Sequence, residues 1–578
     1  MRYFLSLLFM AITVTALSQP SILQWQKTFG GSADEYAQCI RVTKDGGYIF
    51  TGPSDSNDSE VTGNHGLTDY WVVKTDDTGH IQWQTSLGGG GDEVSHAIQQ
   101  TEDLGYIVIG GTSTNTPGGD ISCTVMEWDY WMVKLSPSGA IVWKSCFGGS
   151  NYNVAWSVQQ TSDSGYIVAG TSYSTDGDVT GNHGSGDFWV IKVSSTGSLL
   201  WEKSLGGSGL DQAKSIQQTT DGGYIVAGSS SSNDGQVTGN HGGSDYWAVK
   251  LDDTGAIQWE RSYGGSGTEV CYNVQQTIDG GYIIGGASNS IDGQVTGNHG
   301  GDDYWVVKID DTGAIQWENS YGGAGDEICY SIQQTTDSGY VVAGSTDSAS
   351  GQVKTAHGGN DYWIVKLNTW GELSGERTLG GSGTEIASSV QQTTDGGYII
   401  AGQTSSDDGD ITHNFGGQDF WVVKLSACLL DSPIIISSGD TLGTAITYDT
   451  YQWLLNGIAI TGATSATYAA TVNGNYEVIV TTTGSCSDTS AVKNISGLAV
   501  SNLHNGSVTM EPNPTTGIIN ITGAGQVNVH VYNAVGQLMQ QSANTRTISI
   551  ASLPPGLYFI YLSDINGNII SRDKIIKQ

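Results

Sequence analysis

A stretch of acidic, amide and histidine residues recurs along this chain and could bind a cation or a sugar. In its fullest form it reads Asp176-Gly177-Asp178-Val179-Thr180-Gly181-Asn182-His183-Gly184. Carboxylate and carbonyl oxygens are the ligands that calcium prefers, and Asn and His side chains can hydrogen-bond to hydroxyl groups. The candidate calcium ligands are Asp176, Asp178, Asp234, Asp292, Asp408 and Asp410. The candidate ligand-binding residues are His65, His183, His241, His299, His357, Asn182, Asn240 and Asn298.

The same pattern also has a purely structural interpretation, which we favour. Asp and Asn side chains hydrogen-bond to nearby backbone groups in turns, and the His can be held by a buried partner. An isolated Asp-x-Asp is a weak calcium signal. Calcium therefore stays as the one candidate cofactor, without being required. A zinc site is disfavoured because the histidines occur once per repeat and so lie far apart.

The chain shows no convincing catalytic set. It has no nucleophile elbow, no His-Glu-x-x-His and no phosphate-binding loop. Acidic pairs such as Asp34-Glu35, Asp92-Glu93 and Asp326-Glu327 recur at equivalent positions, whereas a single active site is expected to show as an odd residue in one repeat. We expect a binding protein, with a secreted polysaccharide-degrading enzyme and a structural surface or matrix component as the alternatives.

These residues belong to seven repeats, each marked by Asp-aromatic-Trp. The Trp positions are spaced by 60 residues and then by 58 residues five times, a period typical of repeat architectures. In one repeat, strands are expected at 213–219, 224–228, 246–251 and 256–260, separated by Gly- and Asp-rich turns. The seven markers begin at Asp69, Asp129, Asp187, Asp245, Asp303, Asp361 and Asp419.

Four strands in each of seven repeats predict a seven-bladed β-propeller, with an open β-solenoid as the alternative. The last repeat lacks its fourth strand, while residues 22–25 form a fourth strand with no repeat before it. Pairing these two ends would complete blade seven and remove an exposed edge. We therefore expect an all-β chain in which the N-terminal strand closes the ring.

The first strand of each repeat is expected to be innermost, because it carries a small residue where the blades crowd together. Antiparallel order then places the short turns on one face and the long loops on the other. A turn Asp and a strand-end Lys occur in all seven copies on the turn face, so we expect seven structural ion pairs. The small residues are Ala37, Ser95, Ala155, Ala213, Cys271, Cys329 and Ala387.

The chain has seven cysteines, and the disulfide predicted for two of them below suits an exported protein. Cys123 lies in the long loop of the second repeat, the copy that abandons the loop motif, and Cys146 replaces a Ser or Thr found in every other copy. Both should lie near the loop face, which predicts a Cys123–Cys146 disulfide. Cys39, Cys271 and Cys329 lie on inner strands and are expected to be free and buried.

Composition excludes several classes of partner. The chain has 578 residues, 57 Asp and Glu against 22 Lys and Arg, and a net charge of −35. Nucleic acid and anionic membranes both require Lys and Arg clusters, so neither is an expected partner. Cations, neutral glycans and basic proteins remain. Residues 1–18 read as a signal peptide, with Arg2, a short apolar core and a small-residue cleavage site, and no transmembrane segment is expected after its removal.

The expected organisation is a signal peptide at 1–18, the propeller at 19–426, a β-sandwich at 427–496, a linker at 497–509 and a last domain at 510–578. Trp453 and Tyr476 fit the core of the sandwich, which resembles bacterial Ig-like modules of secreted surface proteins. Cys428 and Cys486 flank this module, and we expect them to pair.

The last 70 residues or so resemble the C-terminal sorting domain of the type IX secretion system. The match lies in Pro512-Asn513-Pro514-Thr515-Thr516-Gly517, Val531–Gln537, Leu553–Tyr558 and the basic end at Lys574. The resemblance implies handling by the type IX machinery and a place outside a Gram-negative cell, secreted or on its outer surface. The residues carrying this signal are Asn513, Pro514, Gly517, Gly536, Gly556, Tyr558 and Lys574. The chain is thus expected to be a secreted or surface binding or adhesion protein whose acidic loop face meets a glycan or a protein.

Overall fold

The computed structural model describes residues 23–115, 118–123, 125–427, 433–444, 448–482, 486–496, 508–564 and 569–578. All regular structure within them is β-strand, and no helix long and apolar enough to span a membrane occurs there. The predicted signal peptide at 1–18 lies outside the described residues, as does Cys428, and the side chain of Cys486 is not described either.

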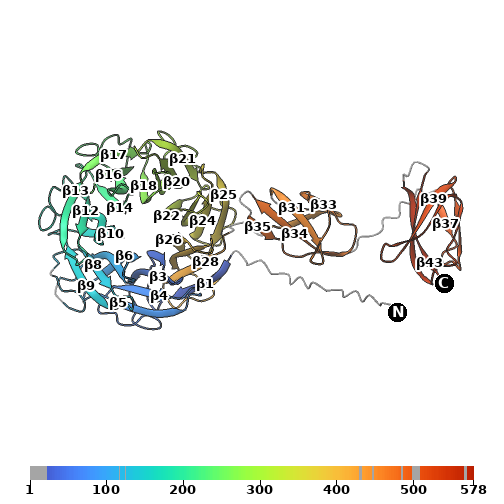
Figure 1. The fold of residues 1–578 in the computed structure, drawn as a ribbon, viewed down its shortest axis with the longest axis horizontal. Helices are drawn as coiled ribbons and strands as arrows, with labels where there is room; N and C mark the ends of the chain where they lie inside the picture. Colours follow the sequence, from blue (N-terminus) through green and yellow to red (C-terminus); the bar gives the residue numbers. More distant parts are fainter. Residues whose placement is uncertain are drawn as a thin grey trace, which may run out of the picture.

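Seven four-stranded antiparallel sheets, counted over the described residues, stand as blades around a central axis (Figure 1). From the inner to the outer strand they are blade 1, β2 (Cys39–Val42), β3 (Tyr48–Ser54), β4 (Asp69–Thr75) and β5 (Ile81–Leu87); blade 2, β6 (Glu93–Gln100), β7 (Tyr106–Thr112), β8 (Asp129–Leu135) and β9 (Ile141–Phe147); blade 3, β10 (Asn153–Gln160), β11 (Tyr166–Ser172), β12 (Asp187–Val193) and β13 (Leu199–Leu205); blade 4, β14 (Asp211–Gln218), β15 (Tyr224–Ser230), β16 (Asp245–Leu251) and β17 (Ile257–Tyr263); blade 5, β18 (Glu269–Gln276), β19 (Tyr282–Ser288), β20 (Asp303–Ile309) and β21 (Ile315–Tyr321); blade 6, β22 (Glu327–Gln334), β23 (Tyr340–Thr346), β24 (Asp361–Leu367) and β25 (Leu373–Leu379); and blade 7, β26 (Glu385–Gln392), β27 (Tyr398–Thr404), β28 (Asp419–Leu425) and β1 (Leu23–Phe29).

Blade 7 takes its outer strand from the other end of the propeller sequence. Strand β1 pairs antiparallel with β28, with Thr28 opposite Trp421 and Lys27 opposite Val422. Each inner strand also contacts the inner strands of both neighbouring blades, including β26 with β2. The ring is therefore closed by backbone hydrogen bonds between residues nearly 400 positions apart in the sequence, and blade 7 gains its fourth strand.

The repeated aromatic pair packs one blade on the next. In blade 4, the ring of Tyr246 lies 4.7 Å from the ring of Trp305 in blade 5, and the Tyr246 hydroxyl donates to the Trp305 carbonyl over 2.9 Å. Both side chains are fully buried. A large aromatic residue with a satisfied polar tip suits this position, because it buries much apolar area and leaves no unpaired donor. The small inner-strand residues are likewise fully buried, as predicted: Ala37, Ser95, Ala155, Ala213, Cys271, Cys329 and Ala387.

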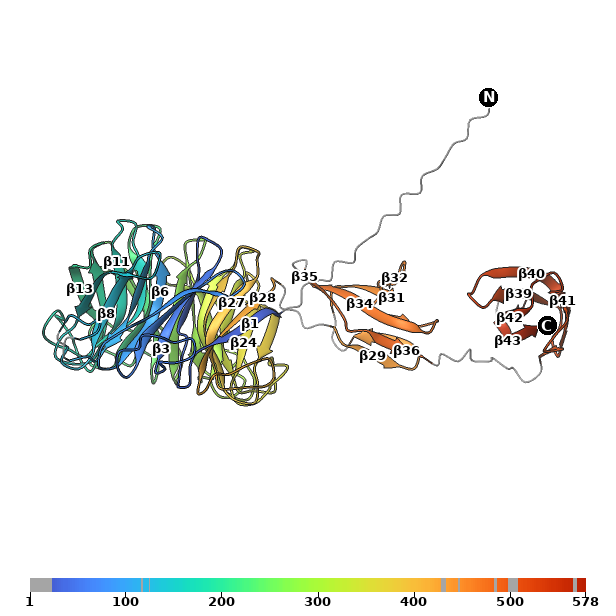
Figure 2. The same ribbon diagram turned by 90° about the horizontal axis from the view of Figure 1, so that it is seen from below.

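The two faces of the ring differ in construction (Figure 2). Short turns join the first strand to the second and the third to the fourth, and the long loops and the crossovers between blades emerge on the opposite face. The predicted turn-face ion pairs are confirmed in all seven blades. In blade 4, Lys250 Nζ lies 2.9 Å from Asp221 Oδ2 and donates to the Leu251 carbonyl. Partial burial raises the pKa of Asp221, but hydrogen bonds from Thr219 and Lys250 outweigh it and lower the pKa to about 2.

Two small sandwiches follow the propeller in the sequence. In the first, Trp453 and Tyr476 are buried in the core, as predicted. Its strands are β29 (Ile435–Ser438), β30 (Thr441–Thr444), β31 (Thr450–Leu455), β32 (Ile458–Ala459), β33 (Thr467–Ala469), β34 (Gly474–Thr482), β35 (Cys486–Thr489) and β36 (Lys493–Ile495). Those of the second are β37 (Thr509–Glu511), β38 (Ile518–Thr522), β39 (Val527–Asn533), β40 (Leu538–Thr545), β41 (Thr547–Ser549), β42 (Gly556–Ser563) and β43 (Ile569–Lys577).

Candidate functional site

The five histidines predicted from the loop motif all lie against the buried Asp of the Asp-aromatic-Trp marker in the same blade. The imidazole Nδ1 is 2.6 Å from the Asp Oδ2 in blades 3 and 4, 2.7 Å in blade 5, 2.8 Å in blade 1 and 3.4 Å in blade 6. The His backbone N–H donates to the same oxygen. About a third of each imidazole is exposed, between 32% and 35%, while each Asp is buried. The pairs are His65–Asp69, His183–Asp187, His241–Asp245, His299–Asp303 and His357–Asp361.

The three predicted asparagines brace the same loops. Asn182 Nδ2 donates to the Ser172 carbonyl, and Asn182 Oδ1 accepts from the Gly184 backbone N–H. Asn240 and Asn298 make the equivalent bonds in the next two blades. These amides therefore fix the loop that carries each His, and their polar atoms are already used within the fold.

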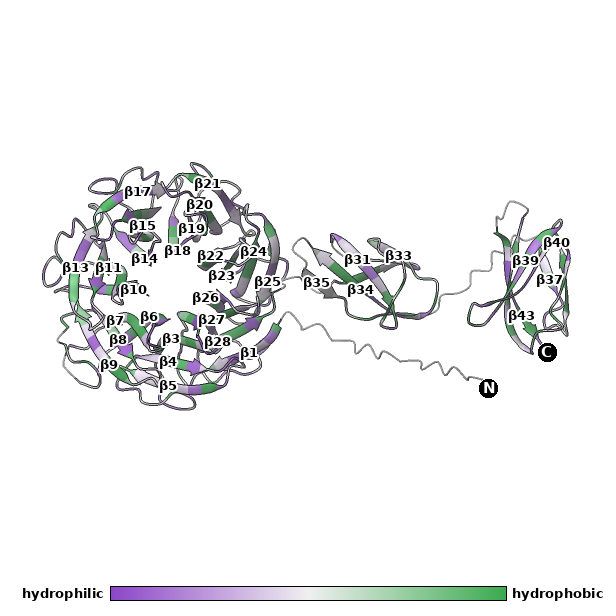
Figure 3. Cartoon of the chain, viewed as in Figure 1, coloured by the Kyte–Doolittle hydropathy of each residue, from purple (hydrophilic) through white to green (hydrophobic). Residues whose placement is uncertain are grey.

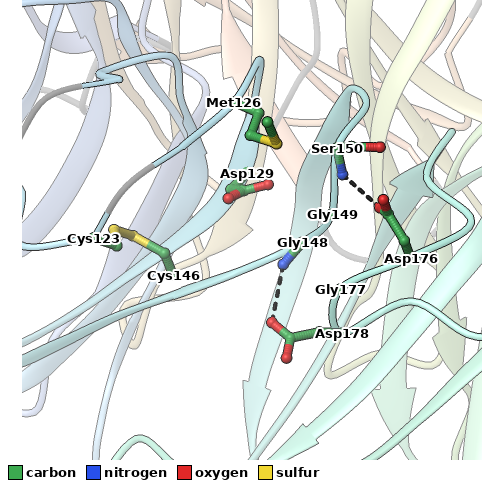
Figure 4. Close-up of a pocket in the computed structure, with 10 residues that line it drawn as sticks. All are labelled: Cys123, Met126, Asp129, Cys146, Gly148, Gly149, Ser150, Asp176, Gly177 and Asp178. Atoms are coloured by element: carbon green, nitrogen blue, oxygen red, sulfur yellow. Dashed lines mark hydrogen bonds between the residues drawn. A yellow bond between two sulfur atoms is a disulfide. The ribbon is translucent and has the colours of Figure 1, made fainter.

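The six predicted calcium ligands instead bind backbone N–H groups of the crossover segments. Asp176 Oδ1 accepts from Ser150 over 2.7 Å, and Asp178 Oδ2 accepts from Gly148 over 3.2 Å (Figure 4). Asp234, Asp292 and Asp408 repeat the first contact, and Asp410 repeats the second. Because the two carboxylates of one loop point at different backbone amides, they do not converge on one cation. Within the described residues, no cluster of three His, Cys, Asp or Glu side chains has metal-binding geometry.

Blade 2 departs from this plan and leaves a pocket on the loop face. The predicted Cys123–Cys146 disulfide is confirmed and forms part of its wall, and Met126 at the rim is 73% exposed. The cavity has a volume of about 330 Å³, and Asp129 is one of the residues that line it (Figure 4). No described His covers Asp129. Burial, and then the nearby Asp178 charge, raise the pKa of Asp129 to about 6, against a hydrogen bond from Asn153.

A second cavity, of about 340 Å³, occupies the turn side of the central channel. Hydrophilic residues appear on the strands that border the central opening, beside the hydrophobic stretches of the blades (Figure 3). The lining is dominated by one Gln from each of six inner strands, with Arg41 at the equivalent position of blade 1. The six are Gln99, Gln159, Gln217, Gln275, Gln333 and Gln391.

A ring of blade-specific residues lies beside this cavity, and the sequence reasoning missed it. It consists of the residue that follows the small inner-strand residue, at a β-bulge in six of the blades. Its members are Gln38, His96, Trp156, Lys214, Tyr272, Tyr330 and Ser388. Most other inner-strand positions carry the same or a similar residue, so a column-by-column comparison of the repeats would have singled out this position as the most variable.

The side chains of this ring contact one another across the blades. The His96 and Trp156 rings lie 3.9 Å apart, and Lys214 Nζ lies 3.2 Å from the centre of the Trp156 ring. Burial lowers the pKa of Lys214 to about 7. Burial, and then the Lys214 charge, lower the pKa of His96 to about 3. The ring therefore holds a neutral imidazole and an amine close to its titration point, in a protein whose other lysines mostly pair with acids.

The predicted sorting-signal residues hold the ends of the last sandwich together. Asn513 Nδ2 donates to the Lys574 carbonyl over 2.7 Å, and Asn513 Oδ1 accepts from the Ile576 N–H over 2.9 Å. The Tyr558 hydroxyl donates to the Pro554 carbonyl over 2.7 Å. Gly536 has a φ of 79°, a conformation that favours glycine at this turn. Pro514 follows Asn513, Gly517 approaches Ala551, and Gly556 begins β42. These residues therefore hold the small fold together.

Comparison with known proteins identifies the last domain. The family model described as a secretion system C-terminal sorting domain matches residues 509–578. Among solved structures, BamB from Moraxella catarrhalis is 14% identical over 67% of this chain and 85% of its own, with a TM-score of 0.34. The Pan2 WD40 domain of Neurospora crassa is 10% identical over 69% and 92%, with a TM-score of 0.38. No curated protein matches the chain.

The sorting domain is the transport signal of the type IX secretion system, which makes this a secreted or cell-surface protein. The seven sheets and this match together identify the chain as a β-propeller repeat protein that ends in a secretion system C-terminal sorting domain.

Proposed function

We propose that this exported propeller is a binding or adhesion protein that presents its acidic loop face to a glycan. The observation that carries the proposal is the repeated His–Asp construction, found in blades 1, 3, 4, 5 and 6 with nearly the same exposure of each imidazole. Near-equivalent sites around one face suit a ligand that is itself repetitive. Several weak contacts made at once by such a ligand add up to a high overall affinity.

The chemistry of each loop supports a hydroxyl-rich ligand. The buried Asp fixes the imidazole through Nδ1, so the other ring nitrogen is the one that can reach a ligand. Exposed Thr and Gly residues lie beside it, and the neighbouring carboxylates are already engaged with backbone N–H groups. A basic protein surface is the competing ligand, because the loops carry many Asp residues and few cations.

The proposal is tested by native affinity electrophoresis of the chain from Gln19 to Gln578 through gels cast with different polysaccharides. We expect one polysaccharide to retard the protein. Replacing the loop histidines with Phe, the residue that blade 7 carries at Phe415, should reduce the retardation step by step as more blades are changed. His80→Phe is the matched control, because His80 lies on the turn face and its side chain is 73% exposed.

Three outcomes decide the matter. Retardation that survives replacement of all five histidines contradicts the proposed site. No retardation by any polysaccharide contradicts a glycan ligand, and binding to a basic protein would then be measured on the same variants. Gels run with calcium and with chelator test the remaining cofactor hypothesis, because loss of retardation in chelator would implicate the Asp-Gly-Asp loops.

The enzyme alternative has one specific observation in its favour, the blade 2 pocket. Asp129, with its pKa raised to about 6, could donate a proton there, and Asp178 lines the same cavity. An acid and a second carboxylate are what glycoside hydrolysis requires. Zones of cleared polysaccharide in the gels, abolished by Asp129→Asn, would contradict the binding proposal and support a polysaccharide-degrading enzyme.

A further inference from the structure

The cavity on the turn side of the central channel is electrostatically unlike the rest of the molecule. The chain carries 57 Asp and Glu against 22 Lys and Arg, yet the residues lining this cavity include one cation, Arg41, and no acid. Arg41 stands where the other six blades carry Gln. A water-filled cavity with low-dielectric walls and a single sign of charge concentrates counter-ions of the opposite sign.

The six Gln side chains present donors to this cavity. Each Gln Oε1 accepts a backbone N–H from the inner strand of the next blade, over 2.5–2.7 Å. This contact uses the oxygen of each amide. No described residue accepts a hydrogen bond from the Nε2 groups of these six residues, each of which carries two N–H donors. The cavity therefore offers a ring of donors, and a complementary ligand must be rich in acceptor oxygens.

Arg41 does not make the hydrogen bond that the equivalent Gln makes in each of the other six blades. Its side chain cannot accept a hydrogen bond, so the junction between blades 1 and 2 lacks the bond from a backbone N–H to a Gln side-chain oxygen. Its Nη1 donates to the Ile40 carbonyl over 2.8 Å and to Ser389 Oγ over 3.3 Å. No carboxylate among the described residues forms an ion pair with it. The guanidinium is therefore held in place and keeps its remaining donors for a ligand.

A second basic residue lies beside the cavity. Lys214 is adjacent on β14 to Ser215, which lines the cavity. Lys214 Nζ lies over the Trp156 ring and has no hydrogen-bond acceptor or acidic partner within the described residues. The seven lysines at the strand ends are largely buried against turn aspartates with which they form ion pairs, whereas this buried amine has no acidic partner among the described residues. Burying an amine without a partner costs stability, and a ligand oxygen would offset that cost.

We propose that the turn side of the channel binds an acidic sugar, a uronate, with its carboxylate drawn to the Arg41 side and its hydroxyl groups on the Gln amides. Lys214, the neighbour of the lining residue Ser215, places a second basic group beside the cavity. Guanidinium groups pair with carboxylates through two parallel hydrogen bonds, and amide N–H groups bind hydroxyl oxygens. A volume of about 340 Å³ lies at the lower end of the range of small-molecule pockets, so it accommodates a sugar unit and not a folded partner.

This site faces away from the long loops, so it is independent of the proposed function. The variants in which loop histidines are replaced with Phe should bind uronate as the parent does. Failure of the loop-face proposal and failure of the channel proposal are therefore distinguishable.

The test is isothermal titration calorimetry of the chain from Gln19 to Gln578 with glucuronate and galacturonate at low ionic strength. Glucose, acetate and inorganic phosphate are the comparison ligands. We expect a uronate to bind at least tenfold more tightly than glucose, acetate or phosphate. Arg41→Gln, which copies the other six blades, should weaken uronate binding at least tenfold without lowering the melting temperature. Lys214→Met should also weaken binding.

Arg261→Gln is the matched control, because Arg261 lies on the outer strand β17 and donates to the Glu260 carbonyl. Its affinity for uronate should equal that of the parent. Equal affinity for uronate and glucose, absence of uronate binding, or unchanged affinity in Arg41→Gln would each overturn the proposal. Phosphate binding as tightly as uronate would also overturn it, in favour of a general anion site.

Discussion

Asn153 donates from Nδ2 to Asp129 Oδ1 over 3.1 Å, at the junction between blades 2 and 3. At the other six junctions, an acidic residue stands at the position of Asn153. The Asp equivalent to Asp129 then has a buried Oδ1 with no hydrogen-bond partner among the described residues. These six residues are Asp69, Asp187, Asp245, Asp303, Asp361 and Asp419. Two carboxyl groups that share a buried site cannot both ionise without a penalty. The junctions between blades are therefore sensitive to pH.

Replacing Phe415 with His should stabilise the propeller at neutral pH. Burial, and then the Glu35, Glu60 and Asp34 charges, raise the pKa of Asp419 to about 7, and Phe415 offers no imidazole donor. Since this pKa lies above that of the unfolded chain, the folded state binds the extra proton between pH 4 and 7, and stability falls as pH rises through that window. A new His–Asp hydrogen bond should therefore add about 1 kcal/mol above pH 7 and little at pH 4.

Urea unfolding of the propeller between pH 4 and 8 measures this difference. His299→Phe is the mirror-image control, because it removes the hydrogen bond to Asp303 and should lower stability mainly above pH 6. Equal changes in the free energy of unfolding at every pH would mean that the substituted aromatic side chain acts through packing alone.

Replacing Asp221 with Asn should reduce the sensitivity of blade 4 to acid. The hydrogen bonds that lower the pKa of Asp221 to about 2 stabilise the fold above the unfolded pKa, and this contribution is lost as pH falls towards 2. Because the Asp221 side chain is 55% exposed, solvent screening limits the effect to less than about 1 kcal/mol. The unfolding midpoints at pH 7 and pH 2.5 should therefore lie closer together in the variant. Asp253→Asn, in the neighbouring exposed turn, should leave that difference as it is in the parent.

Removing the Cys123–Cys146 disulfide should destabilise the propeller by up to about 3 kcal/mol. The bond spans 23 residues, and most of its effect comes from restricting the unfolded chain. The Cys123→Ser, Cys146→Ser variant should unfold at lower urea concentration and lose its response to reducing agent. Should the parent show no change on reduction, the loop of blade 2 would have to be held by its other contacts.

Replacing Lys214 with Met should stabilise the fold while it weakens ligand binding. Burial lowers the pKa of Lys214 from 10.5 to about 7, so the unfolded chain binds the extra proton between these values and parent stability rises with pH there. The variant should therefore gain about 1–2 kcal/mol below pH 7 and nothing near pH 10.5. The titratable groups near the amine are His96 and Cys271. Unfolding from pH 6 to 10 checks the profile, with Gln212→Met on the same strand as the control. A pH-independent gain would indicate improved packing instead.

Repetition made much of the fold predictable. The alternation of apolar and polar residues, the turn residues and the Lys and Asp positions occur once in each of the seven repeats. The four strands, the small inner-strand residues and the Lys–Asp pairs therefore follow from local patterns. The Cys123–Cys146 bond was predictable because the antiparallel order places both residues near one face. The spacing of four between His183 and Asp187 was equally visible in the sequence, yet the partner was missed because the Asp was assigned to the Trp marker alone.

The channel residues could not be predicted in the same way. Gln38, His96, Trp156, Lys214, Tyr272, Tyr330 and Ser388 share no residue type, and a search for repeated motifs passes over them. They become neighbours only because the ring closes and brings seven inner strands to one axis. The sequence by itself determined the blades, their faces and the export signal, because these depend on short-range periodicity and on a linear motif. Only the tertiary structure decided which side chains meet, since contacts such as that of Lys214 with Trp156 join residues 58 positions apart, as one blade packs against the next.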